Sequence, residues 1–207
     1  MELIVDGELN PVSVPEGATV ADVLHLADEQ LSQASRMIVS IRIDGEQLPA
    51  DRLSEYQPRD VSSVERIEIG SQPVQEITQG AIGQLETSLP DLSRTITELS
   101  ATFQQGDTEH AIKVLPRVLD VWLAAVETER TLGSILGADF SSIEVNGQPV
   151  NSLHEALNEE LGKATSALES EDYVLLADLL EHELAPRIRT ELKIVACLKD
   201  LAQRTLS

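Results

Sequence analysis

Histidine and acidic side chains at helical spacing are the feature of this sequence that most suggests chemistry. Asp178 and His182 are four residues apart in a segment with helical periodicity, so they share one face of the expected helix with Glu181 nearby. A carboxylate and an imidazole placed in this way can bind a divalent metal ion. The apolar stripe of the same helix passes through Leu180 instead, so we expect the pair to face water.

A helical metal centre would need more ligands than this segment offers. Di-iron bundles combine Glu-x-x-His motifs on two helices with two further inward carboxylates. The tripeptide Glu181-His182-Glu183 lacks that spacing, and no Glu-x-x-His occurs in the chain. His25, in the first third of the chain, has no second ligand at a suitable spacing. The sequence therefore predicts no metal site and no cofactor.

Signals for nucleophilic or nucleotide chemistry are also missing. Cys197 lies in the apolar stretch Ile194–Leu198 and is expected to be a small buried side chain. The chain contains no G-x-S-x-G, no phosphate-binding P-loop and no G-x-G-x-x-G motif. We therefore expect no catalytic residues and a protein that is not an enzyme.

The charge and the apolar content of the chain exclude several classes of binding partner. Acidic residues outnumber basic ones 36 to 15, for a formal net charge of −21, which repels nucleic acid and anionic lipid. No apolar run approaches the roughly 18–20 residues of a membrane span, and the first ten residues lack the basic region of a signal peptide. We expect a cytoplasmic protein that binds neither nucleic acid nor membranes and has a protein partner.

The first 70 residues alternate between apolar and polar, which is the period of a sheet with one covered face. Strands are predicted at residues 3–5, 12–14, 39–43 and 67–69. Asp6-Gly7 and Asp44-Gly45 are typical hairpin turns. Between the second and third strands, Thr19 can cap a helix, with Asp22 completing a variant of the capping box.

From about residue 74 the apolar period becomes helical. An uninterrupted heptad seam joins Ile82, Leu85, Leu89, Leu92, Ile96, Leu99 and Phe103. Further helices are expected after Asp107, from a Ser152-x-x-Glu155 capping box, and after Asp172. Asn146-Gly147 predicts a small hairpin within residues 140–150. We expect Pro90, Pro116 and Pro186 to kink or split their helices, with a split at Pro90.

The sequence therefore predicts an α+β fold, with an N-terminal sheet domain over 1–71 and an antiparallel four-helix bundle over 74–207. The segments VPEGATVADVL (14–24), VSIRIDGEQLPADRL (39–53) and SVERIEIGS (63–71) resemble β-grasp domains of the ubiquitin-like superfamily, most closely the ThiS and MoaD sulfur carriers. The resemblance covers about a third of the chain. Such carriers end in a reactive Gly-Gly, whereas here the last strand reaches Gly70-Ser71 and the chain continues, which argues against carrier chemistry.

Without a catalytic motif, the sequence favours a non-enzymatic adaptor, with the β-grasp domain as a recognition module on a helical docking platform. Two alternatives remain. The helical half is loosely similar to the flagellar export chaperone FliS in its short Gly-Asp helix junctions. The N-terminal resemblance also implies a carrier-derived regulator that docks on a ThiF-like enzyme and cannot be charged.

Two surfaces are predicted to bind protein. Strand alternation places Ile4, Arg42 and Arg66 on the sheet face opposite the helix, which the β-grasp resemblance implies is a common binding face. The last helix is expected to outrun its neighbours and to expose an apolar patch for a homodimer or a partner helix. That patch comprises Leu192, Val195, Leu198 and Leu201.

Overall fold

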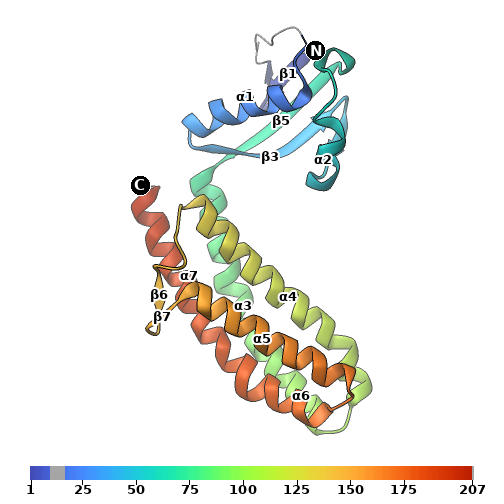
Figure 1. The fold of residues 1–207 in the computed structure, drawn as a ribbon, viewed down its shortest axis with the longest axis vertical. Coiled ribbons are helices and arrows are strands. Elements are labelled where there is room, and N and C mark those ends of the chain that lie inside the picture. The colour runs from blue at the N-terminus through green and yellow to red at the C-terminus, as the bar shows by residue number, and fades with distance from the viewer. Residues whose placement is uncertain (10–16, 207) are drawn as a thin grey trace. The chain divides into compact units, whose positions relative to one another are not determined.

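The chain folds into an N-terminal sheet and a helical C-terminal region (Figure 1). This computed structural model describes residues 1–9 and 17–206, so the strand predicted at residues 12–14 lies outside the described part. Chain contacts divide the protein into two compact units, Met1–Ile77 and Thr78–Ser207. The fold is therefore of mixed α+β class, with each unit built around a core of its own.

The N-terminal unit is a mixed sheet with helical segments packed on one face. Its elements are β1 (Glu2–Val5), β2 (Glu8–Leu9), α1 (Val20–Gln33), β3 (Arg36–Ile43), β4 (Glu46–Leu48), α2 (Ala50–Tyr56), the 3-10 turn η1 (Val61–Ser63) and β5 (Arg66–Pro73). In the described residues the strand order is β2-β1-β5-β3-β4, with β1 parallel to β5 and the other pairs antiparallel. Between the predicted strands at 39–43 and 67–69, the structure adds β4, α2 and η1, which are too short to give a clear period.

Register and local turns explain why these residues form this sheet. Leu3 pairs with Ile67 and Ile41 pairs with Ile69, so their apolar side chains share the face covered by α1. Thr19 and Asp22 form the predicted capping box at the start of α1. The Asp6-Gly7 and Asp44-Gly45 turns adopt positive φ angles, as two-residue hairpin turns of this type require.

One predicted alternation fails inside β3. The pairing of β3 with β5 shifts between Ile38 and Ser40, and Val39 is left 49% exposed rather than pointing to the same side as Ile41 and Ile43. A bulge inserts one extra residue, which reverses the side-chain alternation on its far side. The sequence pattern alone cannot reveal such a shift.

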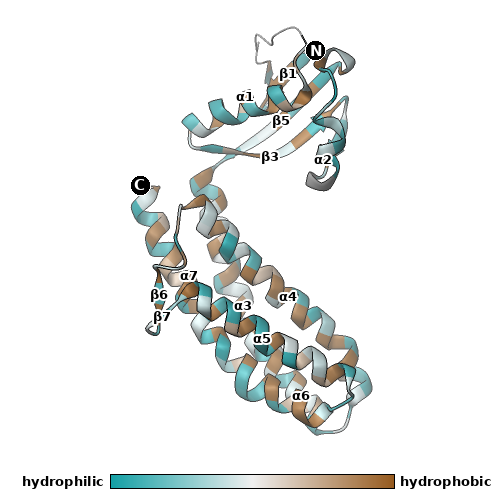
Figure 2. Ribbon diagram, in the orientation of Figure 1, coloured by the Kyte–Doolittle hydropathy of each residue, from teal (hydrophilic) through white to brown (hydrophobic). Residues whose placement is uncertain are grey.

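Long helices make up the C-terminal unit. They are α3 (Val74–Gln104), α4 (Thr108–Ile135), α5 (Val150–Glu169), α6 (Tyr173–Leu179) and α7 (Ala185–Thr205), with the π-helical turn η2 (Leu180–Leu184) joining α6 to α7. Between α4 and α5 lies the predicted hairpin, β6 (Glu144–Val145) and β7 (Gln148–Pro149), turning at Asn146-Gly147. Brown apolar stripes along the helices face inward in Figure 2.

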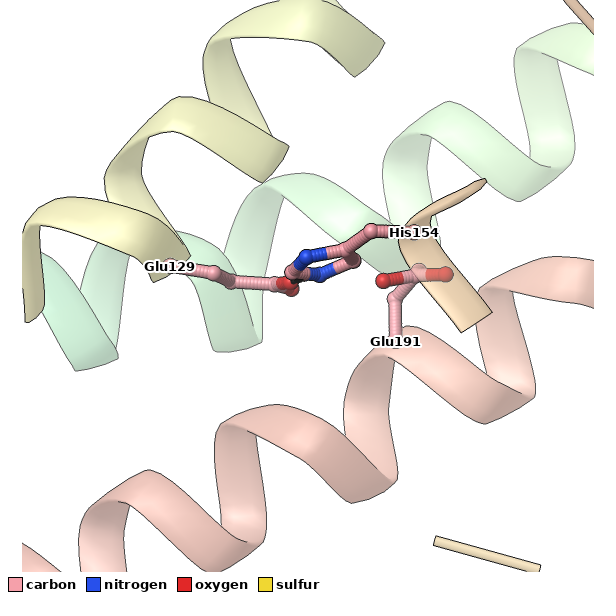
Figure 3. Close-up of side chains that lie close together, drawn as sticks. All are labelled: Glu129, His154 and Glu191. Atoms are coloured by element: carbon pink, nitrogen blue, oxygen red, sulfur yellow. Dashed lines mark hydrogen bonds and ion pairs between the residues drawn. The ribbon is translucent and has the colours of Figure 1, made fainter. Parts of the chain in front are cut away.

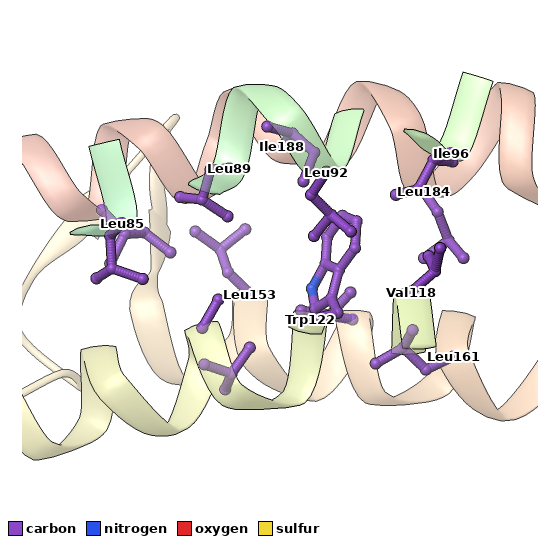
Figure 4. Close-up of a cluster of buried hydrophobic side chains, with 14 of the residues drawn as sticks. Leu85, Leu89, Leu92, Ile96, Val118, Trp122, Leu153, Leu161, Leu184 and Ile188 are labelled. Atoms are coloured by element: carbon purple, nitrogen blue, oxygen red, sulfur yellow. The ribbon is translucent and has the colours of Figure 1, made fainter. Parts of the chain in front are cut away.

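The heptad seam of α3 forms one wall of the helical core, as predicted. All seven residues of the seam are buried, and Trp122 of α4 is only 1% exposed among them. Figure 4 shows leucine and isoleucine side chains from facing helices meeting around this indole ring. Close apolar packing of this kind is what fixes the relative register of the helices.

Helix ends and prolines differ from expectation at Ser152 and at Pro90, but not at Pro186. The helix predicted to start at Ser152 begins at Val150 after Pro149, so Ser152 lies inside α5 and caps nothing. Helices α3 and α4 continue through Pro90 and Pro116 without a break, so the split expected at Pro90 is wrong. Near Pro186 the backbone hydrogen-bonding pattern of the helix does change, because the π-helical turn η2 directly precedes α7.

A fragment of residues 1–77 is expected to fold alone, because its buried apolar residues pack against one another. Ile67→Ala should cost the fragment roughly 2–5 kcal/mol, since Ile67 is fully buried. Ile4→Ala, on the opposite sheet face, should cost less than about 1 kcal/mol. Amide dispersion and urea unfolding measure both effects. A collapsed amide spectrum for the unmodified fragment would show that its core needs the helical unit.

Candidate functional site

Three helices of the C-terminal unit each contribute one ionisable side chain to the core. Glu129 comes from α4, His154 from the first turns of α5 and Glu191 from α7 (Figure 3). Each occupies a position of its helix's apolar stripe; Glu191, for example, lies three residues after the buried Ile188. The helical period therefore carries these polar groups into the interior together with their apolar neighbours.

The three side chains form a compact buried cluster. Glu129, His154 and Glu191 are 0%, 3% and 1% exposed, and one potential ligand atom from each lies within 4.8 Å of the others. His154 Nε2 lies 3.0 Å from Glu129 Oε2, at hydrogen-bond distance. Glu129 Oε1 and Glu191 Oε2 have no hydrogen-bond partner among the described residues. Buried oxygens without partners are costly and uncommon in folded proteins.

Arg187 brings a positive charge to the cluster from one turn earlier on α7. Its Nε donates to Glu191 Oε1 over 3.1 Å, and an Nη group donates to the carbonyl oxygen of Leu153. Another Nη lies 3.8 Å from Glu160 Oε1 on α5. Arg187 thus connects α7 to α5 and partly compensates the buried carboxylates.

A phenyl ring covers the cluster on the side of the α4–α5 connection. Phe140 meets the imidazole of His154 edge-on, with ring centroids 5.7 Å apart. The ring lies so close to α4 that a Cβ atom at Gly133 would stand 2.5 Å from Phe140 Cζ. Phe140 also lines a solvent-open hollow beside Asn151. The ring therefore separates the cluster from the surface.

Burial controls the protonation of the cluster. Desolvation raises the pKa of Glu129 to about 8. A hydrogen bond with Glu191 and the positive charge of Arg187 lower this pKa by smaller amounts. Desolvation, reinforced by the charge of Glu129, raises the pKa of Glu191 to about 7. The pKa of His154 is lowered, first by desolvation and then by Arg130 and Arg187, while Glu191 opposes this change. The closed cluster can hold a proton or a cation, but it offers a substrate no access.

The predicted sheet residues lie together on the open face of the N-terminal unit. Strand pairing sets Ile4 opposite both Leu9 and Glu68, and sets Glu68 opposite Arg42. Arg66, on the same face, pairs with Glu68 over 2.8 Å. Ile4, Arg42 and Arg66 line a shallow hollow on this face. Leu9 is 67% exposed, so apolar and cationic groups meet at this surface.

The apolar patch predicted on the last helix does not exist. Val195 and Leu198 are each only 1% exposed, and Leu192 and Leu201 pack against the same core. The α6–η2–α7 segment is longer than α5, but α3 and α4 are nearly as long and pack in the same core. The reason given for a homodimer or partner helix at this end is therefore wrong.

The other residues considered from sequence stay apart. Asp178 and His182 are exposed, as predicted, and His25 is an exposed partner of Glu29 on α1. Cys197 is a free, half-buried thiol rather than a fully buried one. Within the described chain, no helix combines the length and apolar character needed to cross a membrane.

Two family comparisons match the chain in separate regions. Residues 1–72 match the TP0873 N-terminal domain, and residues 81–191 match the Domain of unknown function DUF8042. The chain belongs to the DUF8042 family. The DUF8042 region contains Glu129, His154 and Glu191, so the whole cluster lies inside the matched segment. No curated protein and no solved structure matches the chain.

The cluster of this DUF8042 protein was not predicted from the sequence. Ligand motifs have a fixed spacing on one helix, whereas these three side chains come from α4, α5 and α7. A usable signal did exist, because Glu129, His154 and Glu191 interrupt apolar stripes at positions that the helical period assigns to the core. Ionisable residues are rarely buried unless they are paired, so such interruptions mark candidate sites.

Glu129→Gln should make the protein's stability less dependent on pH. In the fold Glu129 keeps its proton up to about pH 8, but unfolded it loses the proton near the ordinary value of 4.5. The free energy of unfolding should therefore fall as pH rises between these values, by about 1.4 kcal/mol per pH unit for one such group. Glu129→Gln removes this contribution. The free energy of unfolding of the variant should therefore match that of the wild type near pH 5 and exceed it at pH 8.

Urea unfolding in a chelating buffer from pH 5 to 8.5 measures the effect. Glu127→Gln is the matched control, because Glu127 lies on the same helix but is exposed. If the free energy of unfolding changes equally with pH in the wild type and in Glu129→Gln, Glu129 is not protonated in the fold.

Proposed function

We propose that this protein is a non-enzymatic adaptor that recognises a protein partner through the open sheet face of its N-terminal unit. We assign that unit to the β-grasp class and the helical unit to the antiparallel four-helix bundles. The strand order β2-β1-β5-β3-β4, with β1 parallel to β5 and α1 on one face, supports the first assignment. The shared core of α3, α4, α5 and the α6–η2–α7 segment supports the second.

The observation that carries the proposal is the composition of the open face. Ile4 and the exposed Leu9 are opposite each other on β1 and β2, while Arg42 lies two strands away on β3. Apolar anchors beside an arginine are the groups that most often dominate binding energy at protein interfaces. Arg66 is already paired with Glu68, so Arg42 is the cation better placed to meet a carboxylate of a partner.

The rest of the protein supports binding rather than turnover. The cluster of ionisable side chains around Glu129, which is the best candidate for chemistry, is buried away from solvent. β5 leads directly into α3, so Gly70 has no free carboxyl group to activate. A partner with an apolar side chain flanked by acidic residues would complement the sheet face without any chemistry.

A carrier-derived regulator is the second candidate, favoured by the parallel pairing of β1 with β5. This pairing fits the β-grasp assignment, and the resemblance of the N-terminal unit to sulfur carriers implies docking on a ThiF-like enzyme. This protein would bind such an enzyme without being adenylated. Binding with ATP-dependent formation of an adenylate on the chain would contradict this second candidate.

Combined substitution of the sheet face should abolish partner capture without unfolding the protein. We expect Ile4→Asp with Arg42→Glu to weaken binding at least about tenfold, because it places charge at the apolar anchor and reverses the cation. Photo-crosslinking from residue 47 of β4, next to Arg42, measures capture, and thermal unfolding measures integrity.

The matched control is Val174→Asp with Arg94→Glu. Both residues are exposed on the helical unit, so the same chemical changes are made away from the sheet. Equal loss of capture in both double variants would reject the sheet face as the binding site. A fall of several degrees in the Tm of the Ile4→Asp, Arg42→Glu variant alone would identify the face as an internal interface.

A further inference from the structure

The buried cluster in the helical unit offers more ligand atoms than its own hydrogen bonds use. Glu129 and Glu191 each keep one carboxylate oxygen without a partner, although both side chains are almost completely buried. An imidazole nitrogen from His154 lies beside them. Buried oxygens without partners require an explanation, and a bound ion is one that would supply the missing contacts.

The geometry points to a divalent first-row transition-metal ion, such as Zn²⁺, bound between Glu129, His154 and Glu191. Ligand atoms around one such ion in a tetrahedral site lie about 2.0–2.2 Å from it, hence roughly 3.3–3.6 Å from one another. The three candidate atoms lie within 4.8 Å, so small rotations of the two glutamate side chains bring them into range. An imidazole among the ligands favours such a metal over Mg²⁺ or Ca²⁺, which take oxygen ligands.

Charge balance supports the same assignment. Glu129, Glu191 and Glu160 carry three negative charges when ionised, and Arg187 supplies one positive charge from α7. A divalent ion makes this group neutral. Without the ion, two facing carboxyl groups cannot both be ionised cheaply in this medium, so one of them must keep its proton, which a bound ion would replace.

The surroundings resemble the outer layer of a structural metal site. Arg187 donates to Glu191 Oε1 and leaves Oε2 for the ion, which orients this ligand. Phe140 closes the cluster from the surface, and Gly133 provides the space for its ring. A closed site of this kind would hold α4, α5 and α7 in register and would not process a substrate, so the inference is independent of the proposed adaptor role.

Metal binding by the full chain tests this inference. The protein is unfolded and refolded in chelator, then refolded again with Zn²⁺ or Co²⁺ and desalted. We expect one ion per chain, a rise in Tm of roughly 5–10 °C and, with Co²⁺, visible absorption bands from bound cobalt. Mg²⁺ and Ca²⁺ should leave the Tm unchanged.

Ligand variants decide whether the ion occupies the cluster. Glu129→Gln keeps the shape of the side chain and should fold, yet weaken binding more than about a hundredfold, beyond the 10–100-fold typical of outer-layer residues. His154→Gln and Glu191→Gln repeat the test through the other two ligands. The controls are Glu127→Gln and His182→Gln, which change exposed side chains of the same types and should bind as the wild type does.

Two outcomes would overturn the inference. Refolded wild-type protein that retains no ion and shows no Tm shift would identify the cluster as a metal-free polar network that shares protons. Binding that survives Glu129→Gln but is lost in His182→Gln would identify an adventitious surface site. Loss in the three ligand variants, with both controls unchanged, is the result that we expect.

Discussion

Burying two glutamates and a histidine in an otherwise apolar core is the electrostatic constraint on which the helical unit depends. Each buried charge loses hydration worth several kcal/mol, so the fold must supply compensating partners at defined positions. Arg187 provides one, and it does so by joining α7 to α5 at Leu153 and Glu160. Gly133 and Phe140 then close the site. The register of α4, α5 and α7 is therefore set by polar as well as apolar contacts.

Much of this fold could be predicted from the sequence because its signals are periodic and local. The seam from Ile82 to Phe103 is buried throughout, and the cap at Thr19 and the turn at Asn146-Gly147 occur where their residue types indicate. The predictions that were wrong concern features that depend on residues distant in the sequence. The bulge at Val39 depends on the pairing partner β5, and the burial of Val195 depends on how far neighbouring helices extend.

The candidate cluster could not be predicted for a related reason. Its members lie 25 and 37 residues apart along the chain, on different helices, so no spacing rule connects them. Residue type also points the wrong way, because glutamate is normally found at the surface, whereas the helical period places these two glutamates in the core. At Glu129 and Glu191 the helical period predicts burial and the residue type predicts exposure. Both side chains are buried, so the helical period is correct there. Such conflicts concentrate at functional or strained positions in proteins.

The two units depend on different physical effects, which makes stability and recognition separable. The open sheet face around Ile4 and Arg42 contributes little to the core of the N-terminal unit, since that core lies on the other side of the sheet. The cluster around Glu129 is closed to any macromolecule, so it can act only on the helices that enclose it. The ion proposed for the cluster would therefore change stability, whereas a partner on the sheet face, as proposed, would meet side chains that the fold does not need. In the proposed adaptor, this separation would leave the sheet face free to change its specificity while the helical unit keeps its buried charges balanced.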